Sequence, residues 1–275
     1  MQQRIHRQQE GSLIYYTSDN ITTKHLFTTK FGGVSKGYLA SLNLGFNRGD
    51  ERSNVLQNYQ ILADHFRVPR ARMTMTKQIH SDIVRVVDEN TMGMGLGQPM
   101  SWKADAIITN LPHVPLCGYY ADCVVTLLHD PVSKSIGVCH SGWRGTASGI
   151  LGKTVQRMQE QYGAKPENIE AAIGPSIRQC CFETDADVPD AMTETMGESV
   201  TPFIQPRGKK FFLDLQGINR EQLERCGVRN IVDSGMCTKC MHDTFWSHRA
   251  THGNRGVQAG VIMLEGYEID MKTRQ

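Results

Sequence analysis

Residues 119–145 read YYADCVVTLLHDPVSKSIGVCHSGWRG, two apolar runs on either side of a short polar segment. Both runs are rich in β-branched residues, which is typical of buried strands, and the DPVSKS segment between them carries turn residues. The pattern predicts an antiparallel hairpin with strands at 124–129 and 135–139. Cys123 and His140 stand at the open ends of these strands and their midpoint falls inside the turn, so we expect them to face each other.

The elements around this hairpin indicate an α/β fold. Apolar residues at helical spacing predict one helix with Ser53 as its N-cap and another that stops at Gly163. The expected helices cover 53–66, 146–162 and 216–226, and the further expected strands cover 83–87, 105–109, 170–174, 211–215, 230–234 and 257–264. Because strands occur both as hairpins and in alternation with helices, we expect mixed sheets and not a doubly wound parallel one.

The chain shows no repeat or linker, so we expect one domain over residues 1–275, with 93–99 as a surface loop. A composition of 39% hydrophobic and 21% charged residues is that of a soluble globular protein, and the net charge of +2 gives no broad attraction to nucleic acid or anionic membranes. The first ten residues lack the apolar core of a signal peptide. We therefore expect a cytoplasmic protein without a nucleic-acid or membrane partner; these patterns do not specify its oligomeric state.

His80, in the segment KQIHSDIV, stands directly before an expected strand and is a third candidate ligand. One cysteine and two histidines with an open fourth position are what a catalytic zinc ion needs, whereas Cys123 and His140 alone can form a nucleophilic dyad. A single Cys or His on such a strand is more often a packed structural residue. We interpret Cys117, Cys139 and Cys226 as core residues, and His6, His25, His65 and His113 as surface or loop residues.

Two glycine-containing segments are candidates for binding an anion. Gly142 and Arg144 precede a helix, where backbone N–H groups and a guanidinium can meet phosphate; the alternative is local stacking of Trp143 and Arg144. The segment 28–51 is rich in glycine and polar residues. Its candidates for lining a pocket are Ser41, Asn43, Arg48 and Asp50.

The CTKC motif, Cys237 to Cys240, has His242 nearby and can form a structural zinc knuckle or a redox pair. Cys180 and Cys181 can complete a set of four ligands. Because adjacent cysteines bind one tetrahedral ion poorly, we favour a packing role or an occasional disulfide for these residues over a metal site.

Several segments together resemble one known family: GGVSKGYLASLNLG, QIHSD, ADAIIT, ADCVVTLLHDP, HSGWRG, AAIGPSIRQCCFE, NREQL and GMCT, in order from about residue 25 to 265. They are similar to the YfiH-like purine nucleoside phosphorylases, also described as polyphenol oxidase or laccase-domain proteins. The resemblance implies a single-domain α/β fold with layered mixed sheets, grouped with cysteine hydrolases. It also implies a mononuclear zinc bound by His80, Cys123 and His140, with copper as the alternative metal.

The resemblance further implies phosphate-dependent cleavage of adenosine, inosine, guanosine and methylthioadenosine, together with adenosine deamination. We expect His80, Cys123, His140 and Arg144 to be catalytic residues, and Arg48, Asn43, Ser41 and Gly142 to bind substrate or phosphate. The family more often has other residues at three places in this sequence: Ser81, Ser176 and the segment TFWSHRA. These differences bear on substrate preference. The alternatives are a cysteine hydrolase using Cys123 and His140, a copper-dependent polyphenol oxidoreductase and a non-catalytic purine or metal sensor. The copper function is disfavoured because the chain lacks the several His-x-His pairs of multinuclear copper sites.

Overall fold

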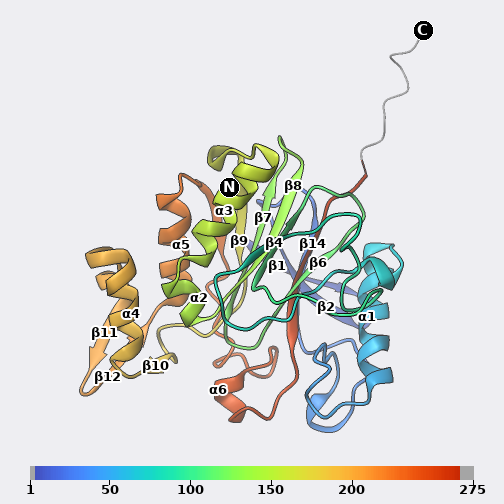
Figure 1. The fold of residues 1–275 in the computed structure, drawn as a ribbon. Coiled ribbons are helices and arrows are strands. Elements are labelled where there is room, and N and C mark those ends of the chain that lie inside the picture. The colour runs from blue at the N-terminus through green and yellow to red at the C-terminus, as the bar shows by residue number, and fades with distance from the viewer. Residues whose placement is uncertain (1–3, 267–275) are drawn as a thin grey trace.

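Two β-sheets pack face to face at the centre of the protein, and the computed structural model describes residues 4–266 of the chain. Helix α1 (Arg52–Phe66) covers the outer face of the five-stranded sheet, and helices α3 (Ile150–Tyr162) and α5 (Leu215–Arg225) cover the outer face of the six-stranded sheet (Figure 1). The layered α/β architecture with mixed sheets is therefore confirmed.

The six-stranded sheet has the order β13-β9-β7-β8-β5-β4, parallel at its two edges and antiparallel in between. Its strands are β4 (Val84–Val86), β5 (Ala106–Thr109), β7 (Val124–Asp130), β8 (Ser135–Ser141), β9 (Glu170–Ile173) and β13 (Asn230–Asp233). The five-stranded sheet is antiparallel, in the order β1-β2-β3-β14-β6. Its strands are β1 (Ile5–Glu10), β2 (Leu13–Ser18), β3 (Lys24–Thr28), β6 (Leu116–Tyr120) and β14 (Gln258–Met263).

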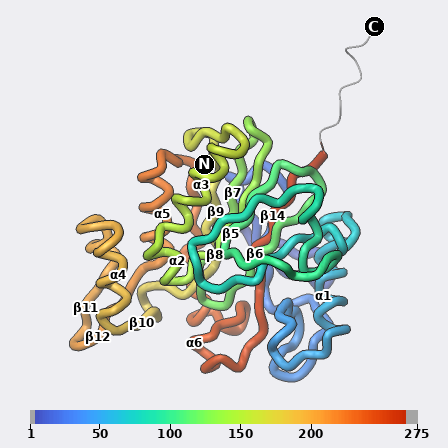
Figure 2. The backbone as a smooth tube through the Cα atoms, in the orientation of Figure 1, coloured from blue at the N-terminus to red at the C-terminus, as the bar shows by residue number. Residues whose placement is uncertain are grey.

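A small third sheet lies at one edge of the molecule, beside α4, as Figure 2 also shows. Its strands are β10 (Glu183–Thr184), β11 (Ile204–Arg207) and β12 (Lys210–Leu213), and the remaining helices are α2 (Trp143–Ala147), α4 (Asp187–Met196) and α6 (His248–Thr251). In the part of the chain that the structure describes, no helix has the length and apolar character needed to cross a membrane.

Three apolar clusters fill the spaces between these layers. One lies between the two large sheets and includes Phe27, Val125 and Leu127, while Leu128 on the opposite face of β7 packs toward the helices. Both faces of β7 are thus buried, which explains why its sequence reads as a continuous apolar run. Cys117 and Cys139 are buried as predicted, whereas Cys226 is only half-buried.

The predicted hairpin forms, but its register differs from the expected one. Val125, not Cys123, lies opposite His140, and Val124 lies opposite Ser141. The turn is therefore centred one residue later than the midpoint of residues 123 and 140, and Cys123 precedes the paired part of β7. The predicted pairing of strands is confirmed, and the predicted facing pair is wrong.

Two helix predictions also need correction. The predicted helix 146–162 is divided into α2 and α3, because Gly149 adopts a left-handed conformation with φ 72° between them. Its end at Gly163, also left-handed with φ 67°, is confirmed. In α1 the N-cap is Glu51, so the prediction of Ser53 as the cap is wrong, although the predicted apolar face is buried.

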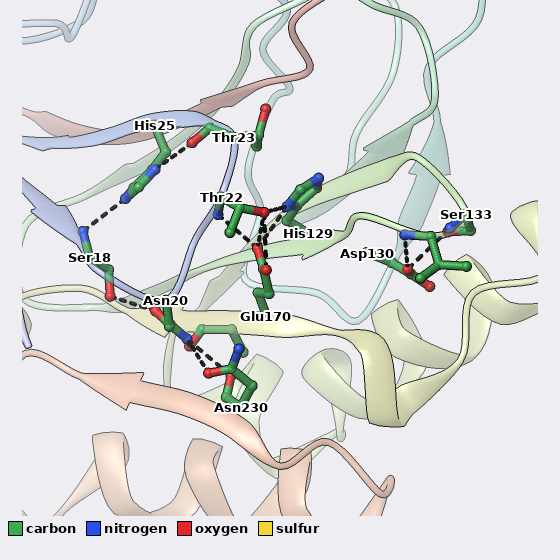
Figure 3. A network of polar contacts seen from close by, with 12 residues as sticks. Ser18, Asn20, Thr22, Thr23, His25, His129, Asp130, Ser133, Glu170 and Asn230 are labelled. Carbon is green, nitrogen blue, oxygen red and sulfur yellow. Dashed lines mark hydrogen bonds and ion pairs between the residues drawn. The ribbon is translucent and has the colours of Figure 1, made fainter. Parts of the chain in front are cut away.

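A polar network joins the two large sheets (Figure 3). Glu170 on β9 accepts a hydrogen bond from the backbone N–H of Thr22, at 2.8 Å, and lies 2.8 Å from Nδ1 of His129 on β7. His25 on β3 is buried, with Nε2 accepting from the N–H of Ser18 and Nδ1 at 2.8 Å from the Thr23 carbonyl. The interpretation of His25 as a surface or loop residue is therefore wrong. His65 lies half-buried on α1, whereas His6 and His113 are exposed.

Candidate functional site

Three predicted ligands converge from three parts of the six-stranded sheet. His80 lies before β4, Cys123 directly before β7, and His140 near the end of β8. A possible ligand atom of each side chain lies within 4.8 Å of those of the other two, with Cys123 Sγ 3.8 Å from His80 Nε2. One thiol and two imidazoles are ligands that zinc and copper both accept, so this donor set fits either metal. We call these residues the His-Cys-His cluster.

Asp105, which directly precedes β5, orients two members of the His-Cys-His cluster. Its carboxylate Oδ1 lies 2.9 Å from His140 Nδ1 and accepts the backbone N–H of His80 at 3.0 Å. The Nδ1 of His140 therefore faces a carboxylate, which leaves Nε2 as the nitrogen that can bind a metal. The other oxygen accepts hydrogen bonds from the backbone and hydroxyl of Ser81.

The site favours charged forms of its groups. Burial alone would raise the pKa of the Cys123 thiol, but the charge of His140 and hydrogen bonds from both histidines lower it to about 6. Burial would lower the pKa of His140, but the Cys123 charge and the Asp105 hydrogen bond raise it to about 9. Although burial opposes the effect, hydrogen bonds from His140 and Ser81 hold the pKa of Asp105 well below its ordinary range. A thiolate is the form that both a metal and an electrophile require.

The backbone around the His-Cys-His cluster adopts uncommon conformations. His80 has φ 60° and Asp122, next to Cys123, has φ 87°, both in the left-handed region. A Cβ atom on Gly142 would lie 2.6 Å from His80 Cδ2 and 3.3 Å from Cys123 Sγ. Glycine is therefore needed at position 142 because the backbone passes directly against two of the candidate ligands.

The other residues predicted to bind an anion occupy different settings. Arg144 is exposed and its guanidinium carbon lies 4.1 Å from the centre of the Trp143 ring, as the stacking alternative expects. Asn43 is fully buried and its side chain bonds the backbone of Gly45 and of Val257. The Ser41 hydroxyl donates to the Lys30 carbonyl. Ser41 and Asn43 thus hold the shape of the loop that carries Arg48, and direct substrate contacts by these side chains stay predictions.

A group of basic residues, of which the sequence analysis named only Arg48, lies near Cys123. Burial and then the charge of Arg48 lower the pKa of Arg255 to about 10, against the opposing charges of Cys123 and Asp122. Burial and then the charge of Arg255 lower the pKa of His248, on which Arg48 also acts. Because charge–charge interactions join Arg255 to Arg48, His248 and Cys123, these three basic residues and the Cys123 thiol share one region. Arg48 and Arg255 are far apart in the sequence and come together only in the folded protein. No local sequence motif could therefore indicate Arg255.

The Arg255 guanidinium is incompletely paired. Its Nη1 donates to the Gly256 carbonyl at 3.1 Å, but its Nε is buried and has no hydrogen-bond partner among residues 4–266. A buried donor without an acceptor is costly, and a guanidinium fork fits the oxygens of a carboxylate or phosphate. Arg255 is a candidate for binding an anion in the region of Cys123.

A cavity of about 870 Å³ adjoins this region. Its lining includes Arg48, the aromatic rings of Phe46 and Tyr119, and Gln78. Gln78 bonds both backbone groups of Tyr119 and stands two positions before His80. Among the described residues, the lining does not include the His-Cys-His cluster. The cavity and the cluster are connected through the chain, because Lys77 and Gln78 line the cavity and His80 follows them.

Four further cysteines form a second cluster. Cys180, Cys181, Cys237 and Cys240 place their sulfur atoms within 4.8 Å of one another. His242, which stands close to the CTKC motif in sequence, is exposed and is not a member of this group within the described chain. The structure therefore brings together all four cysteines that the sequence suggested as a set, including the adjacent pair.

Known proteins resemble this chain over most of its length. The family described as "Multi-copper polyphenol oxidoreductase laccase" matches residues 24–265. The protein "Purine nucleoside phosphorylase YlmD" of Geobacillus stearothermophilus is 37% identical over 235 residues, covering 83% of this chain and 85% of the relative. Its namesake from Bacillus subtilis is 35% identical over 243 residues, covering 87% of both chains.

Solved structures show the same fold. The crystal structure of the hypothetical protein YfiH of Bacillus licheniformis superimposes with a TM-score of 0.87 at 30% identity, covering 94% of this chain and 99% of that one. The structure of YlmD from Geobacillus stearothermophilus gives a TM-score of 0.84 at 33% identity, covering 94% and 99%. The match in sequence and the match in fold agree, and the chain therefore belongs to the YfiH/YlmD family of laccase-like proteins.

Proposed function

We propose that this protein is a zinc-dependent purine nucleoside phosphorylase that acts on adenosine, inosine, guanosine and methylthioadenosine. Its bacterial relatives are named purine nucleoside phosphorylases, which supports the reaction class. The observation that carries the proposal is the meeting of two features, the His-Cys-His cluster and the incompletely paired Arg255 guanidinium near Cys123. A metal-ligating set beside an anion-binding cation suits a reaction between a nucleoside and phosphate.

His80, Cys123 and His140 would hold the metal. When bound, the ion supplies a fixed positive charge that stabilises negative charge developing beside it. Asp105 keeps the Nδ1 proton of His140 in place and thereby fixes the orientation of the ring. The left-handed backbone at His80 is held by hydrogen bonds from the N–H groups of His80 and Ser81 to the same carboxylate.

Arg255 and Arg48 would bind and orient the phosphate. In phosphorolysis a phosphate oxygen bonds to the ribose C1′ while the C1′–N9 bond breaks, and the purine leaves with the bonding electrons and is protonated. Two guanidinium groups would neutralise the phosphate and hold one of its oxygens toward C1′, which lowers the entropic part of the barrier. The cavity lined by Phe46 and Tyr119 would receive the flat, largely apolar purine.

A second candidate function, a cysteine hydrolase, is favoured by one observation. The pKa of Cys123 is lowered to about 6 and that of His140 is raised to about 9, which describes a thiolate next to an imidazolium. Such a pair is also the arrangement of a cysteine nucleophile and its base. The two functions differ in whether Cys123 is bound to a metal in the active protein.

The proposed function is tested by incubating the zinc-loaded protein with adenosine, with and without phosphate, and separating the products by chromatography. We expect adenine and ribose 1-phosphate only when phosphate is present, and neither from Cys123→Ser, which should also lose the metal of this site. The matched control is Cys226→Ser, which removes a half-buried thiol outside both clusters. Full phosphorolysis by Cys123→Ser would contradict the proposal.

The same experiment separates the other activities. Inosine formed from adenosine in both buffers would identify deamination. Alkylation of Cys123, followed by mass spectrometry of its peptide, tests the hydrolase: a metal-bound thiolate should react only after a chelator is added, whereas a free thiolate should react at once. The metal content of the purified active protein decides whether the bound ion is zinc or copper.

A further inference from the structure

The four-cysteine cluster joins two loops that leave neighbouring strands. β9 and β13 are parallel and paired, so their carboxyl ends lie at the same edge of the six-stranded sheet. Cys180 and Cys181 lie in the loop after β9, and Cys237 and Cys240 in the loop after β13. A β-bridge between Ser176 and Cys237 holds the two loops together.

The spacing of the sulfur atoms matches a tetrahedral thiolate site. Cys240 Sγ lies 3.7 Å from Cys180 Sγ and 3.4 Å from Cys181 Sγ, and all four sulfurs are within 4.8 Å of one another. Zinc–sulfur bonds of about 2.3 Å in a tetrahedron place the sulfurs about 3.8 Å apart. Cys240 has two near neighbours at similar distances, which is the geometry of a shared ion and not of one S–S bond.

Two local turns make this set possible. The backbone N–H groups of Cys181 and Phe182 both donate to the Arg178 carbonyl at 2.8 Å, which folds the chain tightly around the adjacent cysteines. Both of these thiols can therefore approach Cys240, contrary to the expectation that neighbouring cysteines bind one ion poorly. Opposite them, the C-x-x-C spacing of Cys237 and Cys240 is that of a zinc knuckle.

The surroundings of the cluster suit bound thiolates. The Arg249 guanidinium donates to the carbonyl of Cys181 at 3.3 Å. A zinc ion with four thiolates carries a net charge of −2, which this nearby cation would partly offset.

We propose that Cys180, Cys181, Cys237 and Cys240 form a tetrathiolate site for zinc, separate from the His-Cys-His cluster. This site goes beyond the proposed nucleoside chemistry and does not depend on it. Its four ligands leave no open position, so the bound ion would be structural and would fasten the two loops to each other.

The fastened loops also position the catalytic centre. Thr238, inside the C-x-x-C turn, donates its hydroxyl hydrogen bond to Asp122 Oδ1 at 2.6 Å, and the backbone N–H of Arg249 donates to Oδ2 at 2.6 Å. From the other loop, the N–H of Ile177 donates to the Asp122 carbonyl at 2.8 Å. Both loops therefore hold the left-handed residue directly before Cys123.

Zinc content per chain tests the proposal, measured on full-length protein purified under reductant and without oxygen. We expect two zinc ions in the parent protein and in Cys226→Ser, one in Cys240→Ser and in Cys123→Ser, and none in the double variant Cys123→Ser/Cys240→Ser. Cys180→Ser serves as a second loss variant at an exposed thiol, in case Cys240→Ser does not fold. Cys123→Ser lacks the other metal site, so zinc bound to this variant reports on the four cysteines alone. The result holds even if the protein shows no phosphorolysis.

Cobalt replacement identifies the ligands. Cobalt-loaded Cys123→Ser should show the intense sulfur-to-cobalt absorption of a tetrathiolate, and further loss of Cys240 should remove it. The proposal is overturned if reduced Cys123→Ser binds neither zinc nor cobalt while its four thiols react freely, or if mass spectrometry finds disulfides among them in the active, reductant-treated protein. That second outcome would assign the cluster to redox chemistry.

Discussion

Asp105 and His140 are joined twice, once through side chains and once through the backbone. The carboxylate Oδ1 lies 2.9 Å from Nδ1 of the imidazole, and the backbone N–H of His140 donates to the Asp105 carbonyl at 2.8 Å. The second bond extends the pairing of β5 with β8, so the sheet itself sets the distance between carboxylate and ring. The orientation of this ligand is therefore built into the register of two central strands.

We expect Asp105→Asn to weaken zinc binding at the His-Cys-His cluster by about 10–100-fold, the usual effect of removing a partner that orients a metal-bound histidine. An amide retains one acceptor oxygen but loses the negative charge that fixes the His140 proton. Competition with a chromophoric chelator measures the affinity. Asp82→Asn is the matched control, because Asp82 is exposed and pairs with Lys153. Equal affinities in both variants would show that Asp105 does not act on the metal.

Gly142→Ala should displace His80. The added methyl carbon would lie 2.6 Å from His80 Cδ2, closer than carbon atoms approach without a shift of one of them. We expect zinc affinity and phosphorolysis to fall together, with the thermal transition much less affected. Gly152→Ala is the control, because its nearest new contact is Cys226 Sγ at 3.3 Å, outside the metal ligands. A Gly142→Ala protein with normal zinc affinity would contradict the close packing seen here.

Arg255→Gln should raise the KM for phosphate by about 10–100-fold, as expected for the loss of a charged hydrogen bond worth about 1.5–3 kcal/mol. The KM for adenosine should change much less, because the guanidinium is proposed to contact phosphate only. Steady-state kinetics with each substrate varied in turn supply both values. Arg144→Gln is the matched comparison, since Arg144 is exposed and stacked on Trp143. A larger phosphate effect at Arg144 would restore the sequence-based assignment.

The Glu170–His129 contact should make the free energy of unfolding decrease as the pH falls into the acid range. Burial would raise the pKa of Glu170, but hydrogen bonds from His129 and Thr22 outweigh it and the pKa lies below its ordinary value of 4.5. A carboxyl whose pKa is lowered by folding stabilises the folded state above pH 4.5, and this contribution disappears as the pH falls through the folded-state pKa.

We therefore expect Glu170→Gln to lower the free energy of unfolding by about 1–3 kcal/mol at pH 7, the cost of leaving buried hydrogen-bonding groups unsatisfied. Below the folded-state pKa the difference from the parent protein should shrink. Urea unfolding at pH 7 and at several acid pH values measures both effects. The exposed Glu160→Gln control should stay close to the parent throughout. A pH-independent difference would assign the loss to packing alone.

The central strands and the three ligands could be predicted because their signals are local. Continuous apolar runs identify β7 and β8, and their flanking Cys123 and His140 are conspicuous polar residues at strand ends. Register was not predictable to the residue, because both faces of β7 are buried and no polar alternation marks which residues pair. The edge strand β1 was missed for the opposite reason, since IHRQQE is almost wholly exposed.

Asp105 and Arg255 were missed because their roles depend on contacts between distant segments. Asp105 had one available signal: an acidic residue directly before the short, mostly apolar and wholly buried strand β5. Arg255 had none, because its setting arises only when the loop carrying Arg48 lies beside the chain before β14. Likewise, two loops separated by more than fifty residues had to meet before Cys181 and Cys240 could be recognised as neighbours.

The central position of β14 has a consequence for how the chain is made. Residues 258–263 insert between β3 and β6, strands that are synthesised much earlier. During synthesis the five-stranded sheet therefore stays incomplete until β14 emerges from the ribosome. Until then β3 and β6 each expose an unpaired edge. The nascent protein is therefore expected to depend on chaperones that shield such edges, even though all three residues of the His-Cys-His cluster have already been translated.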